Sequence, residues 1–97
     1  MRIIYNRLVQ SDVDAIIDYL ERKAGSHFAE KFFDELSNLM ESAKDNPLQF
    51  HPVGDGLRRA NLRRFEYHFL YRVKTDHIRI LVVKHDRRRS TLGRHRK

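Results

Sequence analysis

Two stretches with a helical repeat of apolar residues fill most of the first half of the chain. In the first stretch the i, i+3, i+4, i+7 spacing of one helix face is met by Val13, Ile16, Ile17 and Leu20. Ser11 is a favourable N-cap for this helix. Gly25 favours its end, because glycine readily adopts the left-handed conformation.

A second helical stripe follows directly and ends at a proline. Ser26 can cap this helix, whose apolar positions are Phe28, Ala29, Phe32, Phe33, Leu36, Leu39, Met40 and Ala43. The dipeptide Asn46–Pro47 stops it, because the residue before proline avoids the helical region. Since the connection between the two helices is short, we expect an antiparallel hairpin.

After the loop Leu48–Gly56 the apolar residues recur at every second position, which indicates strands. Leu57–Arg64 is one candidate strand. In the next, Tyr67, Phe69, Tyr71 and Val73 share a face; the turn Lys74–His77 leads to a last strand in which Ile78, Ile80 and Val82 share a face. Arg2–Arg7 supplies a strand at the start.

The predicted fold is a single α+β domain over residues 1–97 with the order β-α-α-β-β-β and both helices on one face of an antiparallel sheet. Residues 94–97 are expected to form a flexible basic tail. The core should pack helix residues against the aromatic strand face, joining Phe28, Phe32, Leu36 and Leu39 to Tyr67, Phe69, Tyr71, Ile78, Ile80 and Val82.

The opposite sheet face combines apolar and charged residues. Leu70, Leu81 and Val83 lie there among basic side chains. Either a partner covers this face, or the tail or a loop of the same chain folds over it. The sequence alone does not separate these alternatives.

Charge is distributed very unevenly along the chain. Residues 1–56 carry 6 Lys and Arg against 10 Asp and Glu, whereas residues 57–97 carry 14 against 3. The net charges of −4 and +11 give the overall +7. Such asymmetry indicates a polyanion or an acidic protein as partner, the alternative being a merely solvated basic surface.

Several classes of protein are disfavoured by composition. The chain has no cysteine, and its six histidines are not spaced as a ligand pair on a helix, so we expect no metal and no other cofactor. No apolar run has the length of a signal peptide or a membrane span. We therefore expect a cytoplasmic protein without membrane contact.

The strand region resembles the signature of the RelE/ParE superfamily of bacterial toxins. Arg63-Arg64-Phe65-Glu66-Tyr67-His68-Phe69-Leu70-Tyr71-Arg72-Val73 is similar to its aromatic hairpin, and Ile78–Val83 followed by Lys84-His85-Asp86-Arg87-Arg88 is similar to its closing element. The helical hairpin and the break at Pro47 also fit. The resemblance covers nearly the whole chain and is nearer to the ParE, plasmid-stabilisation, branch than to RelE.

The resemblance implies the toxin of a type II toxin–antitoxin pair, held inactive by a cognate antitoxin. ParE-like toxins inhibit DNA gyrase, whereas RelE-like toxins are ribosome-dependent endonucleases that cleave mRNA. A non-catalytic, basic nucleic-acid-binding module is a third hypothesis. It is disfavoured because the aromatic residues of the Tyr67 strand share one face and are expected in the core.

RNA cleavage by attack of the 2′-hydroxyl requires a base, cations that stabilise the phosphate, and an acid. The positions matching those of ribonucleolytic relatives are Arg58, Arg59, His68, His85 and Arg88. Two departures count against catalysis: His68 replaces an arginine of RelE, and no tyrosine follows Arg89. A structural or contact role for His85 is therefore preferred to a catalytic one.

The remaining candidates are contact residues for the target or the antitoxin. They are Arg63, Arg79, Leu81, Val83, Arg87 and Arg89. Arginine is favoured where a planar cation meets phosphates or carboxylates, and an acidic antitoxin segment would meet that condition. Because binding survives the loss of catalytic groups, we favour ParE-like inhibition of gyrase over RNA cleavage.

Overall fold

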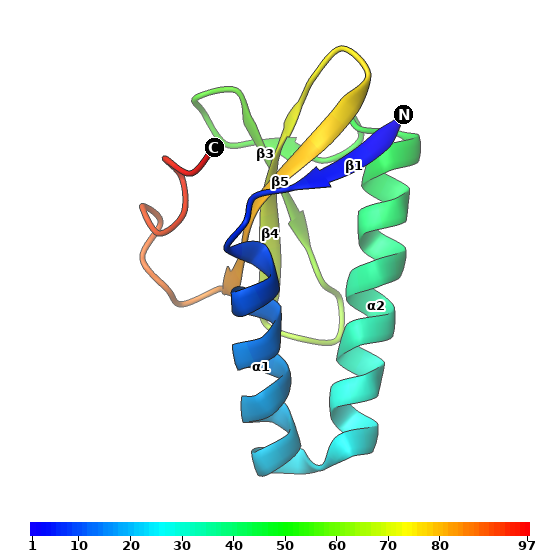
Figure 1. Cartoon of the computed structure of the whole chain (residues 1–97), viewed down its shortest axis with the longest axis vertical. Helices are drawn as coiled ribbons and strands as arrows, with labels where there is room; N and C mark the ends of the chain where they lie inside the picture. Colours follow the sequence, from blue (N-terminus) through cyan, green and yellow to red (C-terminus); the bar gives the residue numbers. More distant parts are fainter.

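The computed structural model describes residues 1–97 as two layers, a helical hairpin and a five-stranded sheet (Figure 1). Its elements are β1 (Arg2–Tyr5), α1 (Val9–Ala24), α2 (Ser26–Asp45), β2 (His51–Pro52), β3 (Leu57–Asn61), β4 (Tyr67–Val73) and β5 (His77–His85). The predicted order of helices and strands is confirmed, with the two-residue β2 as an addition inside the expected loop.

The sheet has the strand order β1-β5-β4-β3-β2. β3, β4 and β5 form the predicted antiparallel meander, and β2 adds an antiparallel strand at one edge. At the other edge β1 pairs with β5 in parallel, which brings the start of the chain beside its last strand. The sequence did not predict this pairing.

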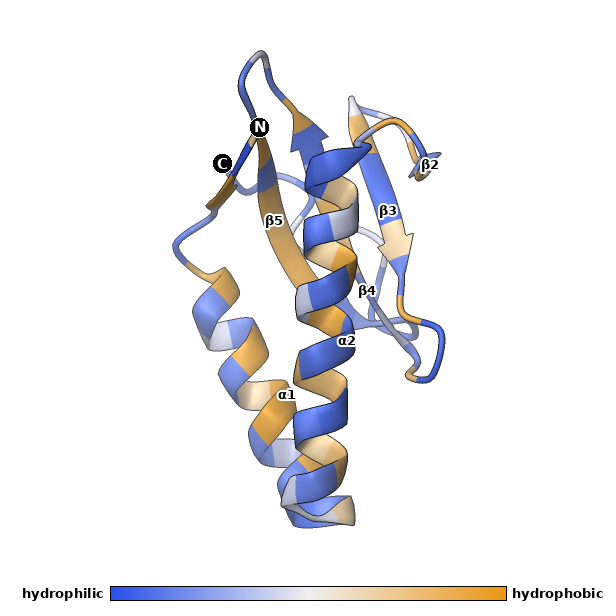
Figure 2. Ribbon diagram, turned by 90° about the vertical axis from the view of Figure 1, so that its right-hand side faces the viewer, coloured by the Kyte–Doolittle hydropathy of each residue, from blue (hydrophilic) through white to orange (hydrophobic).

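Both helices cover one face of the sheet, which we call the helix face. Phe32, Leu36, Phe69, Tyr71 and Ile80 are buried between the two layers, as predicted. Figure 2 shows that the apolar side of each helix and the apolar stretch of β5 lie in this interior. Burial of this apolar surface is the main stabilising contribution to the fold.

Capping of both helices differs from the prediction. α1 begins at Val9 rather than after Ser11, because Val9 is buried and the side chain of Asn6 accepts a hydrogen bond from the Leu8 N–H at 2.9 Å. Gly25 ends α1 as predicted, with φ of +92°. Gly25 also precedes α2, so Ser26 is its first residue rather than its cap.

β3 ends at Asn61, three residues earlier than predicted. Glu35 on α2 accepts hydrogen bonds from the backbone N–H groups of Arg63 and Arg64, the second at 3.3 Å. These two residues therefore turn toward the helix instead of continuing the strand. The turn positions Phe65 against Phe32 in the core.

A β-bulge in β5 changes which residues face the helices. Tyr71 pairs with Ile80 and Leu70 with Val82, so Leu81 is an extra residue without an opposite partner. From this point on, the alternation of side chains is reversed. Val82 lies on the other sheet face and Val83 joins the helix-side core, the opposite of the prediction for both residues.

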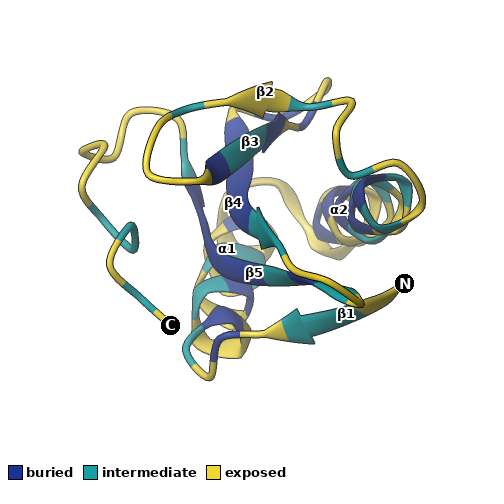
Figure 3. Ribbon diagram, turned by 90° about the horizontal axis from the view of Figure 1, so that it is seen from above, coloured by how far each residue is buried: buried dark blue, intermediate teal, exposed yellow.

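The other sheet face, which we call the second face, is covered by the C-terminal segment, residues 86–97. Viewed from above, this segment runs along one side of the sheet while α2 lies on the other (Figure 3). Beneath it, Leu57, Leu70, Leu81 and Val82 form a small buried cluster with Val53 packed against it. The chain itself thus provides the cover that the sequence left open.

Candidate functional site

The C-terminal segment is attached to the second face by a buried lysine. Lys84 is 4% exposed, and its Nζ donates hydrogen bonds to the carbonyl oxygens of Arg89, Ser90 and Leu92 at 2.9–3.1 Å. Burial lowers the pKa of Lys84, and the positive charge of Arg94 lowers it further. The three carbonyls satisfy all three ammonium protons, which makes burial of this charge tolerable.

Two arginines attach the segment further along. Arg94 donates to the Val53 carbonyl at 2.9 Å and pairs with Asp55 at 3.1 Å. Arg96 pairs with Asp12 on α1 at 2.7 Å. Residues 94–97 therefore differ from the flexible tail that the sequence predicted, because two of their four side chains are held in ion pairs.

A histidine–aspartate pair lies at the centre of the second face. His68 on β4 is 2% exposed, and its Nδ1 is 2.8 Å from Oδ1 of Asp86. Arg59 on β3 reaches the same carboxylate oxygen at 3.4 Å. Burial lowers the pKa of His68, the hydrogen bond to Asp86 opposes this effect, and the charges of Arg59 and Lys84 lower it again.

A cavity of about 410 Å³, which we call the second-face cavity, opens beside this pair, between the sheet and the C-terminal segment. Arg59, His68 and Lys84 line it from the sheet, and Asp86, Arg88, Ser90 and Arg94 line it from the segment. Four positive side chains thus surround a space that only one carboxylate enters.

His85 lies on the opposite, helix face of the sheet. Its Nδ1 accepts a hydrogen bond from the Arg87 N–H at 3.0 Å, its Nε2 is 3.6 Å from Glu66, and its ring meets Tyr67 edge-on. Because Nδ1 is occupied as an acceptor, neutral His85 carries its proton on Nε2. These contacts hold the turn after β5 and support a structural role.

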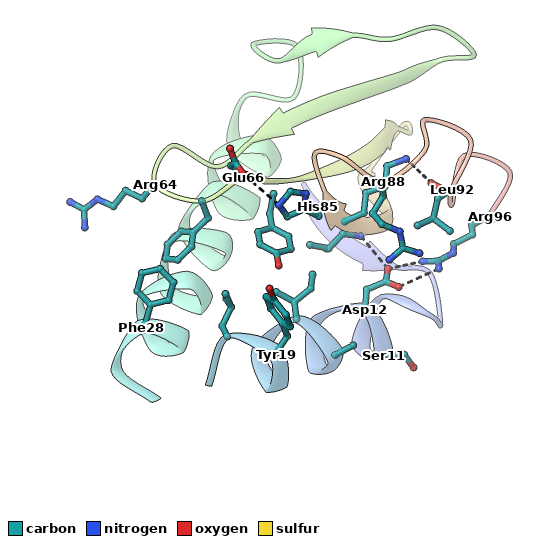
Figure 4. Close-up of a pocket in the computed structure, with 17 residues that line it drawn as sticks. Ser11, Asp12, Tyr19, Phe28, Arg64, Glu66, His85, Arg88, Leu92 and Arg96 are labelled. Carbon is teal, nitrogen blue, oxygen red and sulfur yellow. Dashed lines mark hydrogen bonds and ion pairs between the residues drawn. The ribbon is translucent and has the colours of Figure 1, made fainter. Parts of the chain in front are cut away.

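A larger cleft, which we call the α1 groove, lies next to His85 (Figure 4). It has a volume of about 670 Å³ between α1 and the turn before β4. Tyr19 and Phe28 line it and remain nearly half exposed. Arg64, Lys84, Arg88 and Arg96 also line it against two carboxylates, Asp12 and Glu66, so an apolar floor is combined with an excess of positive charge.

The five proposed catalytic residues are not brought together at one point. Arg59, His68 and Arg88 line the second-face cavity, whereas His85 lies across the sheet and lines the α1 groove, to which Arg88 also contributes. Arg58 lines neither space, and its guanidinium donates to the Phe50 carbonyl at 2.7 Å, holding the loop before β2.

The proposed contact residues fall into two groups. The arginines Arg63, Arg87 and Arg89 are exposed, and Arg79 is partly exposed, with its guanidinium donating to the Lys97 carbonyl. Leu81 and Val83 are buried, at 0% and 2% exposure. The expectation that these two form an open contact surface is wrong for this structure, because the C-terminal segment covers the first and the bulge turns the second into the core.

Sequence reasoning missed the roles of Asp12, Lys84 and Arg96. Asp12 lies in the first turn of α1, and its carboxylate accepts hydrogen bonds from Arg96 and from the Val83 N–H. A lysine within an apolar strand, Val82-Val83-Lys84, was the one available signal of a buried charge.

No group of three or more His, Asp or Glu side chains is arranged to bind a metal, and no helix has the length and apolar character of a membrane span.

Comparison with known proteins identifies the class to which this fold and basic surface belong. Residues 3–90 match the model of the ParE toxin of the type II toxin–antitoxin system parDE. The chain belongs to this family of toxins. It is also similar to a solved structure described as the chromosomal ParDE toxin–antitoxin system from P. aeruginosa, with 25% identity, a TM-score of 0.78 and coverage of 88% of this chain and 95% of that one. No curated protein matches the chain.

Proposed function

We propose that this ParE-family toxin arrests growth by binding DNA gyrase, that it cleaves no nucleic acid itself, and that a cognate antitoxin neutralises it. The observation that carries the proposal is the separation of His68 and His85 by the sheet. Hydrolytic or transesterifying cleavage needs an acid and a base on either side of one phosphate. Two histidines on opposite faces cannot supply that pair, whereas a surface rich in arginine still binds an acidic or phosphate-rich target.

Brief expression of the chain distinguishes the two modes of action. Supercoiling by gyrase should fall, while the ends of ribosome-associated transcripts stay unchanged. His85→Ala and Arg88→Ala should leave transcript ends unchanged as well. New cuts within codons that disappear in both variants would show mRNA cleavage instead, and arrest with neither effect would indicate a third target.

For the antitoxin we propose docking in the α1 groove rather than on the second face. The apolar side chains of Tyr19 and Phe28 are open to solvent, and the arginines beside them favour a partner with carboxylates. An amphipathic antitoxin segment would place apolar residues on the floor and Asp or Glu at the rim. Such a segment would bury the exposed aromatic side chains and pair its carboxylates with Arg64 and Arg88, which have no ion pair within the chain.

A pair of half-exposed aromatic residues provides a matched test of this docking surface. Tyr19→Glu places a carboxylate inside the groove and should weaken antitoxin binding and relief of growth arrest. Phe33→Glu makes a comparable change on α2 outside the groove, at 48% exposure against 47% for Tyr19. An equal loss of binding in both variants, or no loss in either, would refute this docking site. If the unaltered toxin and the antitoxin do not co-purify, the proposal that an antitoxin binds this chain is wrong.

A further inference from the structure

We propose that the second-face cavity binds a doubly charged tetrahedral oxyanion, the phosphate of a phosphomonoester. This proposal concerns a ligand of the chain and does not depend on which cellular target the toxin inhibits. It is supported by the cavity between the sheet and the C-terminal segment, by the charge around it, and by a ring nitrogen of His68 that has no partner in the chain and is open to the cavity.

The charge around the cavity determines the class of ligand. Arg59, Lys84, Arg88 and Arg94 are positive, while Asp86 lies in the cavity and Asp55 pairs with Arg94 from outside. Four cations against two carboxylates leave an excess of two positive charges. A phosphomonoester carries close to two negative charges at neutral pH, whereas a carboxylate or a phosphodiester carries one.

Free hydrogen-bond donors point to the same ligand. The Arg88 guanidinium makes no hydrogen bond or ion pair within the chain, and Nη1 of Arg59 and Nη1 of Arg94 are unused. All three guanidinium groups belong to residues that line the cavity. Guanidinium groups pair with phosphate oxygens through charge-assisted hydrogen bonds, which are stronger than neutral ones. Lys84 contributes charge only, because its three protons are already bonded to carbonyls.

His68 adds a specific signature. Its Nδ1 bonds Asp86, while its Nε2 has no partner in the chain. Every fully enclosed side-chain nitrogen or oxygen does have a partner, so Nε2 is open to the cavity. With the Nδ1 proton donated to Asp86, neutral His68 presents a lone pair there. A dianion would be repelled by this lone pair, so its binding favours protonated His68, which then donates from Nε2.

Titration of the isolated chain with simple anions tests the proposal. Sodium sulfate and sodium phosphate, added at constant ionic strength, should give saturable NMR shifts of the amides around His68, Lys84 and Asp86. Sodium acetate should give none that saturate. Acetate binding as tightly as sulfate, or sulfate shifts spread over the whole basic surface without saturation, would overturn the proposal.

Two adjacent arginines supply the matched variants. Arg88→Gln should weaken sulfate binding by roughly tenfold, because Arg88 lines the cavity and its guanidinium has no partner within the chain. Arg87→Gln removes the same charge one residue away, at an exposed side chain outside the cavity, and should change affinity by less than about twofold. Both residues are exposed, so neither variant disturbs the core. Equal losses would show general screening instead of a site.

Proton uptake separates a role for His68 from a merely structural one. Sulfate cannot take up a proton near neutral pH, so calorimetry in two buffers of different ionisation enthalpy reports protonation of the protein alone. The native chain should take up a proton on sulfate binding at pH 7, and His68→Gln should not. The groups facing His68 are Asp86, Arg59, Lys84 and, across the cavity, Arg88 and Arg94. Uptake that persists in His68→Gln would overturn the assigned role of Nε2.

A comparison of two dinucleotides identifies the source of the phosphate. A 5′-phosphorylated dinucleotide that binds more tightly than inorganic phosphate indicates a nucleic-acid end, and equal binding indicates a free phosphate compound. Either result supports the proposal. If the same dinucleotide without its terminal phosphate binds equally well, the cavity recognises the phosphodiester or the bases, and the proposal is wrong.

Discussion

The ion pair between Asp12 and Arg96 should contribute far more to stability than the other ion pairs on this small protein. The Asp12 carboxylate accepts two hydrogen bonds from Arg96, at 2.7 and 3.2 Å, and one from the Val83 N–H at 3.1 Å. The two side chains are only 16% and 18% exposed. Removing one member of a buried pair typically costs 3–5 kcal/mol. Because both side chains keep some contact with water, we expect about 3 kcal/mol for Asp12→Ala.

A double-mutant cycle isolates the pair from the hydrogen bond to Val83. Free energies of unfolding are measured in urea for the native chain, Asp12→Ala, Arg96→Ala and the double variant. We expect a coupling energy of about 2 kcal/mol, between the values of exposed and fully buried pairs. A domain of this size has a stability of roughly 5–15 kcal/mol, so the loss should be easily measured.

The chain offers its own control for this cycle. Arg2 and Asp76 form a pair at 3.2 Å with side chains 65% and 68% exposed. Solvent screening should keep its coupling well below that of the Asp12 pair. If the coupling of the Asp12 pair is no larger than that of the Arg2 pair, the ion pair between Arg96 and Asp12 does not attach the C-terminal segment to the first turn of α1.

Three further outcomes are expected in the same unfolding assay. Phe32→Ala should cost about 3–5 kcal/mol, because the ring is fully buried, and a cost below about 1 kcal/mol would contradict its central place in the core. Gly93→Ala should destabilise the protein more than Gly25→Ala, although both glycines have positive φ. A Cβ at Gly93 would lie 2.5 Å from the Cβ of Val82, whereas no atom lies within 4 Å of a Cβ at Gly25. Equal costs would contradict the close packing of the C-terminal segment. Burial lowers the pKa of His68, so the unfolded chain binds a proton more readily than the folded chain. The contribution of His68 to stability should therefore be complete above about pH 6.5 and fall as the pH drops from there toward the lowered pKa of the folded state. His68→Gln should remove this part of the pH dependence, measured in chloride without sulfate or phosphate.

Local patterns predicted most of the fold because each element buries its own repeat. The helical stripe of α2 is set by neighbouring residues such as Phe32 and Leu36, and the alternation of β4 is set by its own residues, such as Phe69. Pairing of β1 with β5 is a contact between distant segments, and no local repeat specifies it. The early start of α1 depends on burial of Val9, which is also a tertiary effect.

The candidate site was harder to predict because one residue reverses a face. An uninterrupted alternation along β5 places His85 on the same side as Leu81 and therefore beside His68. The bulge at Leu81 moves His85 to the helix face and leaves His68 with Lys84 on the other. A shift of one position exchanges every later side chain between the two faces of a strand. No hydrophobic pattern in Ile80-Leu81-Val82-Val83 indicates where that extra residue lies.

The attachment of Arg96 to Asp12 also sets the order of events during synthesis. The two residues are 84 positions apart, and ribosomes add about 5–20 residues per second. About 4–17 seconds therefore pass between the appearance of Asp12 and that of its partner. Leu81 and Val82 are made shortly before Arg96, and until Arg96 is in place they lack the cover that residues 86–97 give them in the folded chain. The cover of the second face is therefore completed late in folding, because the residue that attaches it to α1 is made 84 positions after Asp12.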